Sequence, residues 1–499
     1  MTSEISPLRI RALNDLPVRR DGDFVVYWMI ANRRLCWNFS LQHAVDESVR
    51  LGKPLLIVEA LRSGYDWASD RIHRFVLQGM ADNRATAASY GVRYFAYVEP
   101  EAGSGSGMLD ALAKKACVVV TDDFPCFFLP RMLRAVAARL PARIEAVDSN
   151  GLLPLRATDK VFTTAYAFRR FLQKELPAHM LELPDPEPLA DRKLKSFDRL
   201  PRGFEKRWSE ASEDLLQASC EALSALPIDH AVKPAVFDGG SQAAYDTLDS
   251  FIDSRLDRYT DERNQPESDA ASGLSPWLHF GHVSAHEVFA RILQREDWSK
   301  SQLAEKSKGS REGWWGMSPE AESFLDELIT WRELGFNMCS KRDDYDQYES
   351  LPEWARATMK EHESDPRPHL YSLDELDAAE THDELWNAAQ NQLVTEGRMH
   401  NYLRMLWGKK IYQWSASPRA ALKTLIELNN RYAVDGRNPN SYSGIFWCLG
   451  RYDRAWGPER PIFGKIRYMT SENTARKLKV KGYIQRYGRR EHIQKTLWD

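Results

Sequence analysis

The chain has 499 residues, of which 43% are hydrophobic, and its formal net charge at pH 7 is −3. This length is enough for two domain-sized cores, and the small negative charge makes no overall case for a polyanionic partner. The six cysteines are scattered without a Cys-x-x-Cys pair, which argues against a disulfide scaffold and against a zinc site.

The N-terminal segment MTSEISPLRIRALND lacks the apolar stretch of a signal peptide, and no apolar run approaches the length of a membrane span. Together with the cysteine pattern, these features predict a cytoplasmic protein with no membrane partner and no bound metal. A nuclear or organellar address stays open.

The N-terminal half alternates short apolar runs with amphipathic segments. The runs that predict strands are FVVYWMI from Phe24, PLLIVEAL from Pro54, VRYFAYVE from Val92, CVVVTDD from Cys117 and RIEAVDS from Arg143. Helical patterns at 41–51, 71–90 and 130–140 lie between them. Strands that are apolar on both faces and alternate with helices predict a doubly wound parallel sheet. No G-x-G-x-x-G or P-loop follows the first strand, so a classical dinucleotide or nucleoside triphosphate site is not supported.

The second half has a different pattern. Residues 182–207 are rich in proline and charge and read as the start of a linker, so we expect an α/β domain at 1–181, a linker at 182–234 and an all-α domain at 235–499. Helix starts recur after the linker, where Ser275, Ser318 and Ser417 each precede a proline as a predicted N-cap. Residues 300–318, with a Trp-Trp pair, read as a loop insertion.

The stretch from Thr381 to Trp414 predicts two consecutive helices that contain three of the sixteen tryptophans. Thr381 has the spacing of a capping box, and Gly397 ends the first helix. On the second helix Trp407 and Trp414 are two turns apart on one face, with α-carbons roughly 10 Å apart. Indoles at this spacing can pass an electron or can simply fill a core, and the spacing alone leaves both interpretations open.

Two further patterns carry chemistry. The small-residue loop from Ala271 to Pro276 runs into a helix N-terminus, a natural seat for a phosphate, although an ordinary capped helix fits the same residues. Arg404 lies one turn before Trp407; if it is buried it needs an anion, and Asp435 is the candidate, with a purely structural salt bridge as the alternative.

These motifs resemble the class II cyclobutane pyrimidine dimer (CPD) photolyases of the photolyase/cryptochrome superfamily. The matching segments are SGLSPWLHFGHVSAHEV from Ser272, FLDELITWRELGFN from Phe324, the 381–414 stretch, ELNNRYAVDGRNPNSYSGIFW from Glu427 and ERPIFGKIRYM from Glu459. The resemblance covers nearly the whole chain. It implies an N-terminal antenna domain, an all-α FAD-binding catalytic domain, and the activity of a deoxyribodipyrimidine photo-lyase, in which photoexcited reduced FAD donates an electron to a flipped-out pyrimidine dimer in DNA. It also implies room for a second, antenna chromophore of deazaflavin or folate type.

The resemblance assigns site residues by position. Those implied to hold FAD are Ser272, Gly273, Leu274, Ser275, Arg404, Asn429 and Asp435. Those implied to carry electrons are Trp386, Trp407 and Trp414. Those implied to form the lesion pocket are Arg263, Asn264, Glu327, Trp331, Met405 and Trp447. Those implied to contact DNA beside the lesion are Arg451, Arg454 and Trp456.

Several of these residues have implied roles. Asn429 would lie near the flavin N5 and accept or donate a hydrogen bond as the protonation state changes. Trp407 is our choice for the tryptophan nearest the flavin, and the order of the three stays open. Trp331 and Trp447 would flank the dimer, while Glu327, four residues before Trp331, would hydrogen-bond a base edge.

One loop departs from the family pattern at two positions. The family usually reads D-G-R-D-P-N-G-Y, whereas this chain has Asn438 and Ser441 in place of the acid and the glycine, which affects flavin tuning rather than flavin binding.

Residues 460–490 hold ten Lys and Arg against one acid. This is the pattern of a phosphate-binding face, with a solvated tail as the alternative.

The partner we expect is DNA that contains pyrimidine dimers, bound by a monomeric protein. A cryptochrome-like flavin photoreceptor and a non-catalytic nucleic-acid-binding protein are the rival interpretations. Glu327, Trp331 and Trp447 argue against the photoreceptor, because a receptor needs no lesion pocket.

Overall fold

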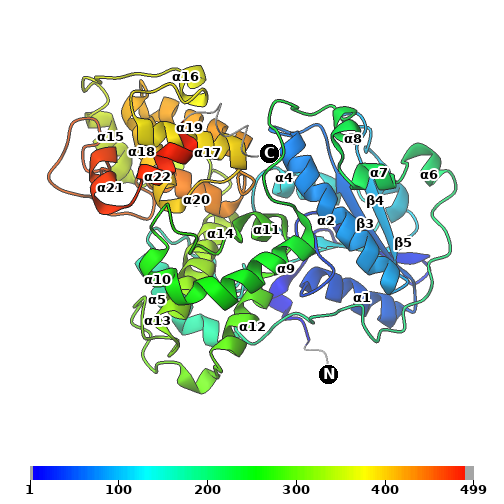
Figure 1. The fold of residues 1–499 in the computed structure, drawn as a ribbon. Coiled ribbons are helices and arrows are strands. Elements are labelled where there is room, and N and C mark those ends of the chain that lie inside the picture. The colour runs from blue at the N-terminus through cyan, green and yellow to red at the C-terminus, as the bar shows by residue number, and fades with distance from the viewer. Residues whose placement is uncertain (1–3, 489–499) are drawn as a thin grey trace.

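The computed structural model describes residues 4–488, in which an α/β region is followed by a mainly helical region (Figure 1). In Figure 1 the sheet lies beside helices α1, α2 and α4, and the helices of the second region gather on the other side of the molecule. This is the predicted combination of an α/β half and an α half.

The sheet has six strands in the order β1-β6-β5-β2-β3-β4. The parallel strands are β2 (Phe24–Met29), β3 (Leu55–Leu61), β4 (Arg93–Val98), β5 (Ala116–Asp122) and β6 (Ile144–Val147). Each coincides with a predicted strand. The short β1 (Ile10–Ala12), which the sequence pattern did not indicate, pairs antiparallel with β6.

The sheet is buried on both faces, as a doubly wound sheet requires. Along β2, Val26 and Trp28 belong to one hydrophobic core while Val25 and Tyr27 belong to the other. Alternate side chains of a strand point to opposite faces, so each face has its own core. The helices that connect the strands are α1 (Phe39–Leu51), α2 (Asp70–Ser89), α3 (Met108–Ala113) and α4 (Leu129–Ala137).

The segment 182–234 packs across the α/β region. It contains the short helices α6 (Phe204–Arg207), α7 (Glu213–Leu216) and α8 (Cys220–Ser224). Leu216 and Leu223 belong to the core that also holds Val25 of β2. The segment therefore adds apolar surface to the α/β region instead of crossing open solvent.

The helical region has no strand among residues 235–488. Its longer elements are α9 (Gly240–Ser250), α12 (Ala285–Arg295), α13 (Pro319–Leu325), the π-helix η6 (Asp326–Trp331), α14 (Arg332–Lys341), α15 (Glu353–Glu361), α17 (Glu384–Glu396), α18 (Asn401–Trp414), α19 (Pro418–Tyr432), α20 (Pro439–Cys448), α21 (Ser471–Lys477) and α22 (Lys481–Tyr487). The shorter ones are the π-helix η3 (Phe251–Arg255), α10 (Tyr259–Glu262), α11 (Ser275–Phe280) and α16 (Leu373–Asp377). Helix α5 (Ala165–Glu175) precedes the linker.

Two predicted helix caps are confirmed and two are wrong. Ser318 and Ser417 accept hydrogen bonds from the backbone of Ala321 and Ala420, as N-caps do. Ser275 instead lies inside α11 as its first residue. The cap of α17 is Asp383, because Thr381 bonds to the side chain of Asn387.

The insertion 300–318 is anchored by buried groups. Trp314 and Trp315 are buried with ring centroids 4.7 Å apart, and Trp315 lies 5.5 Å from Phe289 of α12. The carboxylate of Glu322 accepts the backbone N–H groups of Gly313 and Gly316. This insertion is therefore part of the core around α12 and α13.

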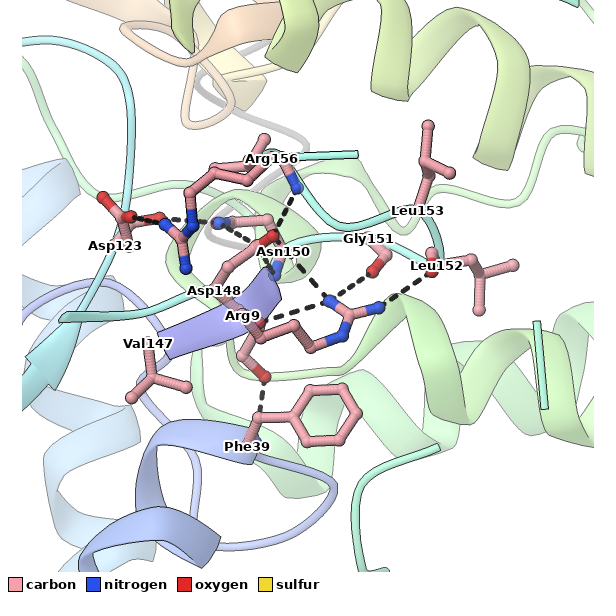
Figure 2. Close-up of polar contacts among 12 residues, drawn as sticks. Arg9, Phe39, Asp123, Val147, Asp148, Asn150, Gly151, Leu152, Leu153 and Arg156 are labelled. Carbon is pink, nitrogen blue, oxygen red and sulfur yellow. Dashed lines mark hydrogen bonds and ion pairs between the residues drawn. The ribbon is translucent and has the colours of Figure 1, made fainter. Parts of the chain in front are cut away.

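A buried polar junction fastens the α/β region to helix α14, and Figure 2 shows the part of it that Arg9 forms. The guanidinium of Arg9 donates to the carbonyls of Gly151 at 3.1 Å and Leu152 at 2.8 Å. From the other side, the carboxylate of Glu333 accepts the N–H groups of Leu152 at 2.7 Å and Leu153 at 3.1 Å. The loop between them is held through its backbone by charges from both regions.

A second junction lies at His282, which is fully buried between α2 and α9. Its Nδ1 accepts the N–H of Gly240 at 2.9 Å, and its ring stacks on Phe75 at 5.1 Å. A Cβ at Gly79 would lie 2.4 Å from Nε2, so only glycine fits this position of α2. Burial lowers the pKa of His282 to about 3, which keeps the imidazole neutral.

The neutral imidazole predicts a pH dependence of stability. The unfolded chain protonates His282 below pH 6.5, whereas the folded chain does so only near pH 3, so stability is present above pH 6.5 and is lost as pH falls. The expected loss from this group is about 1.4 kcal/mol per pH unit. Urea unfolding of the wild type and of His282→Asn, at pH 7.5 and at pH 5, measures it. The stability difference between the two proteins should shrink at pH 5; an unchanged difference would contradict the prediction.

Candidate active site

The three predicted electron-transfer tryptophans meet between α17 and α18. Trp386 is fully buried, and its Nε1 donates to the carbonyl of Trp407 at 3.1 Å. Its ring lies against that of Trp414 with centroids 5.5 Å apart and an interplanar angle of 72°. Trp386 therefore contacts both of the others and lies between them.

The acceptor of the Trp407 indole is the side chain of Gln390. The Nε1 of Trp407 donates to Gln390 Oε1 at 2.9 Å, and both residues are buried. An indole nitrogen only donates, so this contact also fixes which end of the Gln390 amide is the oxygen. Nothing in the sequence pattern pointed to Gln390.

The outer end of this tryptophan series reaches the surface. The ring of Trp414 lies 5.4 Å from Tyr371 and 5.3 Å from His382, and the hydroxyl of Tyr371 is 2.6 Å from His382 Nδ1. His382 is exposed, whereas Trp414 is buried. The series thus runs from the interior at Trp407 to solvent at His382.

Arg404 and Asp435 form the predicted ion pair. The guanidinium donates to both carboxylate oxygens, at 3.1 and 3.3 Å, and Ser275 donates to the same carboxylate at 2.7 Å. Burial disfavours the charged carboxylate, yet Arg404 and these hydrogen bonds hold the pKa of Asp435 below its usual range. The contact from Ser275 joins the small-residue loop to the VDGRNPN loop.

The small-residue loop is shaped by its backbone. Gly273 has a φ of +71°, which glycine adopts without strain, and Arg255 donates to the carbonyl of Ala271 at 2.9 Å. The helix that follows has no side-chain cap and spans only six residues. Its first backbone N–H groups are therefore not used by a capping side chain, and the short helix adds little dipole.

Asn429 is buried on α19 and contacts Ser441, one of the two positions that depart from the family pattern. Its Nδ2 donates to the hydroxyl of Ser441 at 2.6 Å. Asn438 is the N-cap of α20, and its Oδ1 accepts the N–H of Ser441 at 2.7 Å. Asn438 thus positions Ser441, and Ser441 in turn accepts the hydrogen bond from Asn429.

Arg263 and Glu327 of the predicted lesion pocket form an ion pair of 2.7 Å. Glu327 lies in the π-helix η6, which ends at the half-buried Trp331; such irregular turns recur at functional sites. Burial raises the pKa of Glu327, and Arg263 opposes that shift. Asn264 is exposed beside Arg263.

Trp447 is half-buried at the end of α20, next to two cations. The ammonium of Lys409 lies 4.8 Å from its ring centroid, and the guanidinium of Arg467 lies at 5.4 Å. Arg467 also lies 4.1 Å from the ring of Trp456 and pairs with Asp453 at 2.8 Å. Arg467 thus connects the two tryptophans, a role with no signal in the sequence.

Met405, also predicted for this pocket, lies on α18 and faces α20 at Gly444. A Cβ at Gly444 would lie 3.8 Å from the Met405 Cε, and the two helices pack against each other. Met405 is half-buried, as Trp331 and Trp447 are.

Of the three predicted DNA contacts, Arg451 has to be corrected. It is 2% exposed, stacks over Phe446 at 3.7 Å, and donates to the Tyr345 carbonyl and the Ser350 hydroxyl. A guanidinium enclosed in this way supports the fold and is closed to a phosphate. Arg454 is exposed, 4.9 Å from the ring of the half-buried Trp456.

The basic segment 460–490 has two sides. Its exposed cations are Arg460, Lys465, Arg476, Lys477, Lys479, Lys481 and Arg486. Tyr483 and Tyr487 point inward, where their hydroxyls donate to Gln392 at 2.7 Å and Glu396 at 2.6 Å. These two tyrosines are core residues, and Arg489 and Arg490 lie outside the described residues.

A separate cavity of about 330 Å³ opens at the carboxyl ends of the parallel strands. Its lining includes Arg33, Tyr65, Phe127, Phe128, His279 and Arg437. None of the residues predicted to hold FAD lines it. His279 and Arg437 come from the helical region, so the cavity ends close to the Asp435 loop.

Within residues 4–488, no helix is long and apolar enough to cross a membrane. In the same residues, no cluster of three or more His, Cys, Asp or Glu side chains could hold a metal ion.

An α/β region joined to a helical region that buries a tryptophan series defines the photolyase/cryptochrome fold. A class III photolyase from Agrobacterium tumefaciens matches 93% of this chain and 86% of its own length with a TM-score of 0.65 at 18% identity. A cryptochrome from Synechocystis matches 93% and 88% with the same TM-score at 14% identity. These likenesses establish the fold.

Sequence comparison establishes the family, although no protein-family model matches the chain. A deoxyribodipyrimidine photo-lyase of Methanothermobacter thermautotrophicus is 35% identical over 96% of this chain and 97% of its own length. Those of Arabidopsis thaliana and Potorous tridactylus are 34% and 31% identical over 97% and 95% of this chain, and 93% and 83% of their own lengths. The chain belongs to the deoxyribodipyrimidine photo-lyase family, on its class II branch.

The Arg404–Asp435 pair gives a stability prediction that needs no ligand. Asp435→Asn leaves the largely buried Arg404 without a counter-charge and should lower the free energy of unfolding by about 3 kcal/mol. The double variant Arg404→Met with Asp435→Leu removes both charges and should lose less than Asp435→Asn alone. Urea unfolding at pH 7 measures all three proteins; a double variant that is the least stable would contradict this account.

Proposed function

We propose that the chain repairs cyclobutane pyrimidine dimers in DNA by light-driven electron transfer from photoexcited reduced FAD to the flipped-out dimer. The observation that carries the proposal is the composition of helix α18. Within one turn this helix presents Arg404, paired with Asp435, then the half-buried Met405 and the buried Trp407. A flavin contact, a wall of the lesion pocket and the inner electron-transfer tryptophan would thus come from adjacent positions of one rigid helix.

Buried polar atoms support a flavin beside α18. Arg404 Nε and Gln390 Nε2, whose side chains lie on α18 and against Trp407 of α18, are buried and have no hydrogen-bond partner within residues 4–488. Buried donors without partners are costly, and a polar ligand beside α18 would satisfy them. FAD offers carbonyl, ring-nitrogen and phosphate acceptors, and it would supply the photoexcited electron donor.

By the family resemblance, Ser272, Gly273, Leu274 and Ser275 hold the pyrophosphate of FAD. Arg404 and Asp435 would lie beside the isoalloxazine, and Asn429 would lie near N5. The uncapped start of α11 and the left-handed Gly273 suit a backbone cradle for phosphate oxygens.

The tryptophans would carry electrons inward in the order Trp414, Trp386, Trp407. Trp386 contacts both of the others, and Trp414 approaches the exposed His382. The acceptors of the two inner indoles are an amide and a backbone carbonyl. Neither of these groups takes up a proton, so an inner indole would keep its N–H while an electron passes.

In the lesion pocket Trp331 and Trp447 would stack on the dimer, and Glu327 would hydrogen-bond a base edge. Arg263 holds the Glu327 carboxylate by its ion pair, while Asn264 and Met405 complete the walls. Arg467 and Lys409 lie next to Trp447 and stabilise its position through contact with the ring.

The DNA contacts would come from Arg454, with Trp456 filling the gap that the flipped dimer leaves. The exposed cations of segment 460–488 extend the same positive surface, because phosphate contacts need unburied Lys and Arg. Arg451 is not among the contacts.

The cavity at the carboxyl ends of the strands is the proposed binding site of an antenna chromophore of deazaflavin or folate type. Ligands of doubly wound sheets bind at the carboxyl ends of the strands. The walls are aromatic: Phe127 and Phe128 have ring centroids 4.8 Å apart, and Tyr65 lies 5.9 Å from Phe128. Phe127 has a φ of +61°, a strained conformation for a bulky residue of the kind found at binding sites. A planar pigment suits such walls.

Repair of a thymine-dimer oligonucleotide tests the proposal. FAD-loaded, chemically reduced protein should restore intact thymines under blue light and leave the dimer unchanged in darkness. Trp331→Ala should weaken lesion binding roughly tenfold, because stacking on an aromatic ring contributes about 1–3 kcal/mol per base. Binding of the undamaged oligonucleotide should stay unchanged. A flavin-bound protein without light-dependent recovery would favour the photoreceptor interpretation instead.

The tryptophan series makes a separate prediction. Trp386→Phe interrupts the series between Trp414 and Trp407, so light-driven reduction of the oxidised flavin should slow by roughly tenfold or more; a barrier increase of about 1.4 kcal/mol suffices for that factor. Repair by chemically reduced protein should not change. Trp298→Phe, outside the series, is the matched control. Equal photoreduction by the wild type and by Trp386→Phe would exclude this route.

A further inference from the structure

The orientation of the Asn429 amide can be read from the hydrogen bonds around it. The neighbouring Asn430 Oδ1 accepts the backbone N–H of Arg437 at 3.0 Å. A backbone N–H only donates, so this atom of Asn430 must be the oxygen. Asn430 is fully buried, and its Nδ2 faces the Tyr442 hydroxyl at 3.3 Å, which agrees with this assignment.

This oxygen fixes the next amide in turn. The Asn429 atom that faces Asn430 Oδ1 at 3.2 Å must be a donor, and therefore Nδ2. The second hydrogen of Nδ2 goes to the Ser441 hydroxyl oxygen at 2.6 Å. Both hydrogens of the amide are thus engaged, and its remaining polar atom, Oδ1, is an acceptor only.

The Ser441 hydroxyl is held in place by the start of α20. Asn438 caps this helix and accepts the N–H of Ser441 at 2.7 Å, which fixes the first turn of the helix. Ser441 is 5% exposed, so water does not compete for its hydroxyl. A glycine at this position, as in the usual family motif, has no hydroxyl and leaves one amide hydrogen without this partner.

We propose that Ser441 is a positioning residue that locks Asn429 as a hydrogen-bond acceptor toward N5 of the bound flavin. The inference rests on the proposed function, which places Asn429 near N5. Reduced flavin carries a hydrogen on N5 and is a donor to Asn429 Oδ1. Oxidised flavin has a lone pair at N5, which the same oxygen repels. The lock therefore favours the reduced flavin, the form that the proposed repair reaction needs.

The reduction potential of the bound flavin, measured in darkness against a redox dye, tests the lock without any activity assay. In Ser441→Ala the amide gains a free hydrogen and can turn Nδ2 toward the oxidised N5. The oxidised-to-reduced equilibrium should move toward the oxidised form by roughly tenfold, which is about 30 mV more negative for a two-electron couple. Ser441→Gly should shift the potential in the same direction, and Ser441→Thr, which keeps the hydroxyl, should stay near the wild type.

Two further variants separate positioning from a change in structure. Ser443→Ala removes a hydroxyl from the same helix, where it donates to the Pro439 carbonyl at 2.9 Å, and should leave the potential unchanged. In an Asn429→Ala background, Ser441→Ala should have no further effect, because the group that it orients is gone.

The outcomes distinguish this inference from the proposed function. A protein that binds FAD but shows the same potential in the wild type and in Ser441→Ala would overturn the lock and leave flavin binding intact. An equal shift in Ser443→Ala would also overturn it, since the effect would then belong to the helix. A chain that binds no FAD on reconstitution would overturn both.

Discussion

The backbone of the loop 148–153 is held between buried charges from two regions, and the position of the candidate lesion pocket depends on this contact. Arg9, the residue before β1, donates to the loop carbonyls, while Glu333 accepts the loop N–H groups and Arg332 donates to the carbonyl of Asn150 at 2.6 Å. Burial raises the pKa of Glu333 to about 7 and lowers that of Arg332 to about 10, so each charge depends on its partners. Because α14 continues directly from the π-helix η6, the junction also sets where Glu327 and Trp331 point.

In the helical region, neighbouring residues of α18 have different surroundings, one apolar and one charged. Trp407 is buried and donates a hydrogen bond to the Gln390 amide, whereas Arg404, one turn away, pairs with the carboxylate of Asp435, which also accepts the hydroxyl of Ser275. An aromatic series needs burial and weakly basic neighbours, while an anionic cofactor needs donors that lack partners. Both kinds of surroundings occur around one helix, because α17, α19 and α20 all pack against α18.

Much of the fold followed from the sequence because its signals are local. Apolar runs and helical periodicity located five of the six strands and the main connecting helices. Most of the wrong or missed elements depend on a partner that is distant in the sequence. Ser275 bonds to Asp435 instead of capping its helix. The cap of α17 was misplaced locally, because Asp383, two residues after Thr381, caps the helix instead. The three-residue strand β1 forms only because β6 is there to pair with it.

For the site, the sequence by itself determined that Arg404 and Trp407 lie one turn apart on a helix, and the family resemblance implies the roles proposed for them. Tertiary structure alone decided which groups touch. It enclosed Arg451 against Phe446, turned Tyr483 and Tyr487 inward, and set Gln390 against Trp407 and Arg467 between Trp447 and Trp456. It also turned two departures from the family motif, Asn438 and Ser441, into a hydrogen-bonded support for Asn429. The physical reason is that residue type and spacing specify what a side chain can bond to, whereas burial and direction, which select the actual partner, arise only when distant segments pack together.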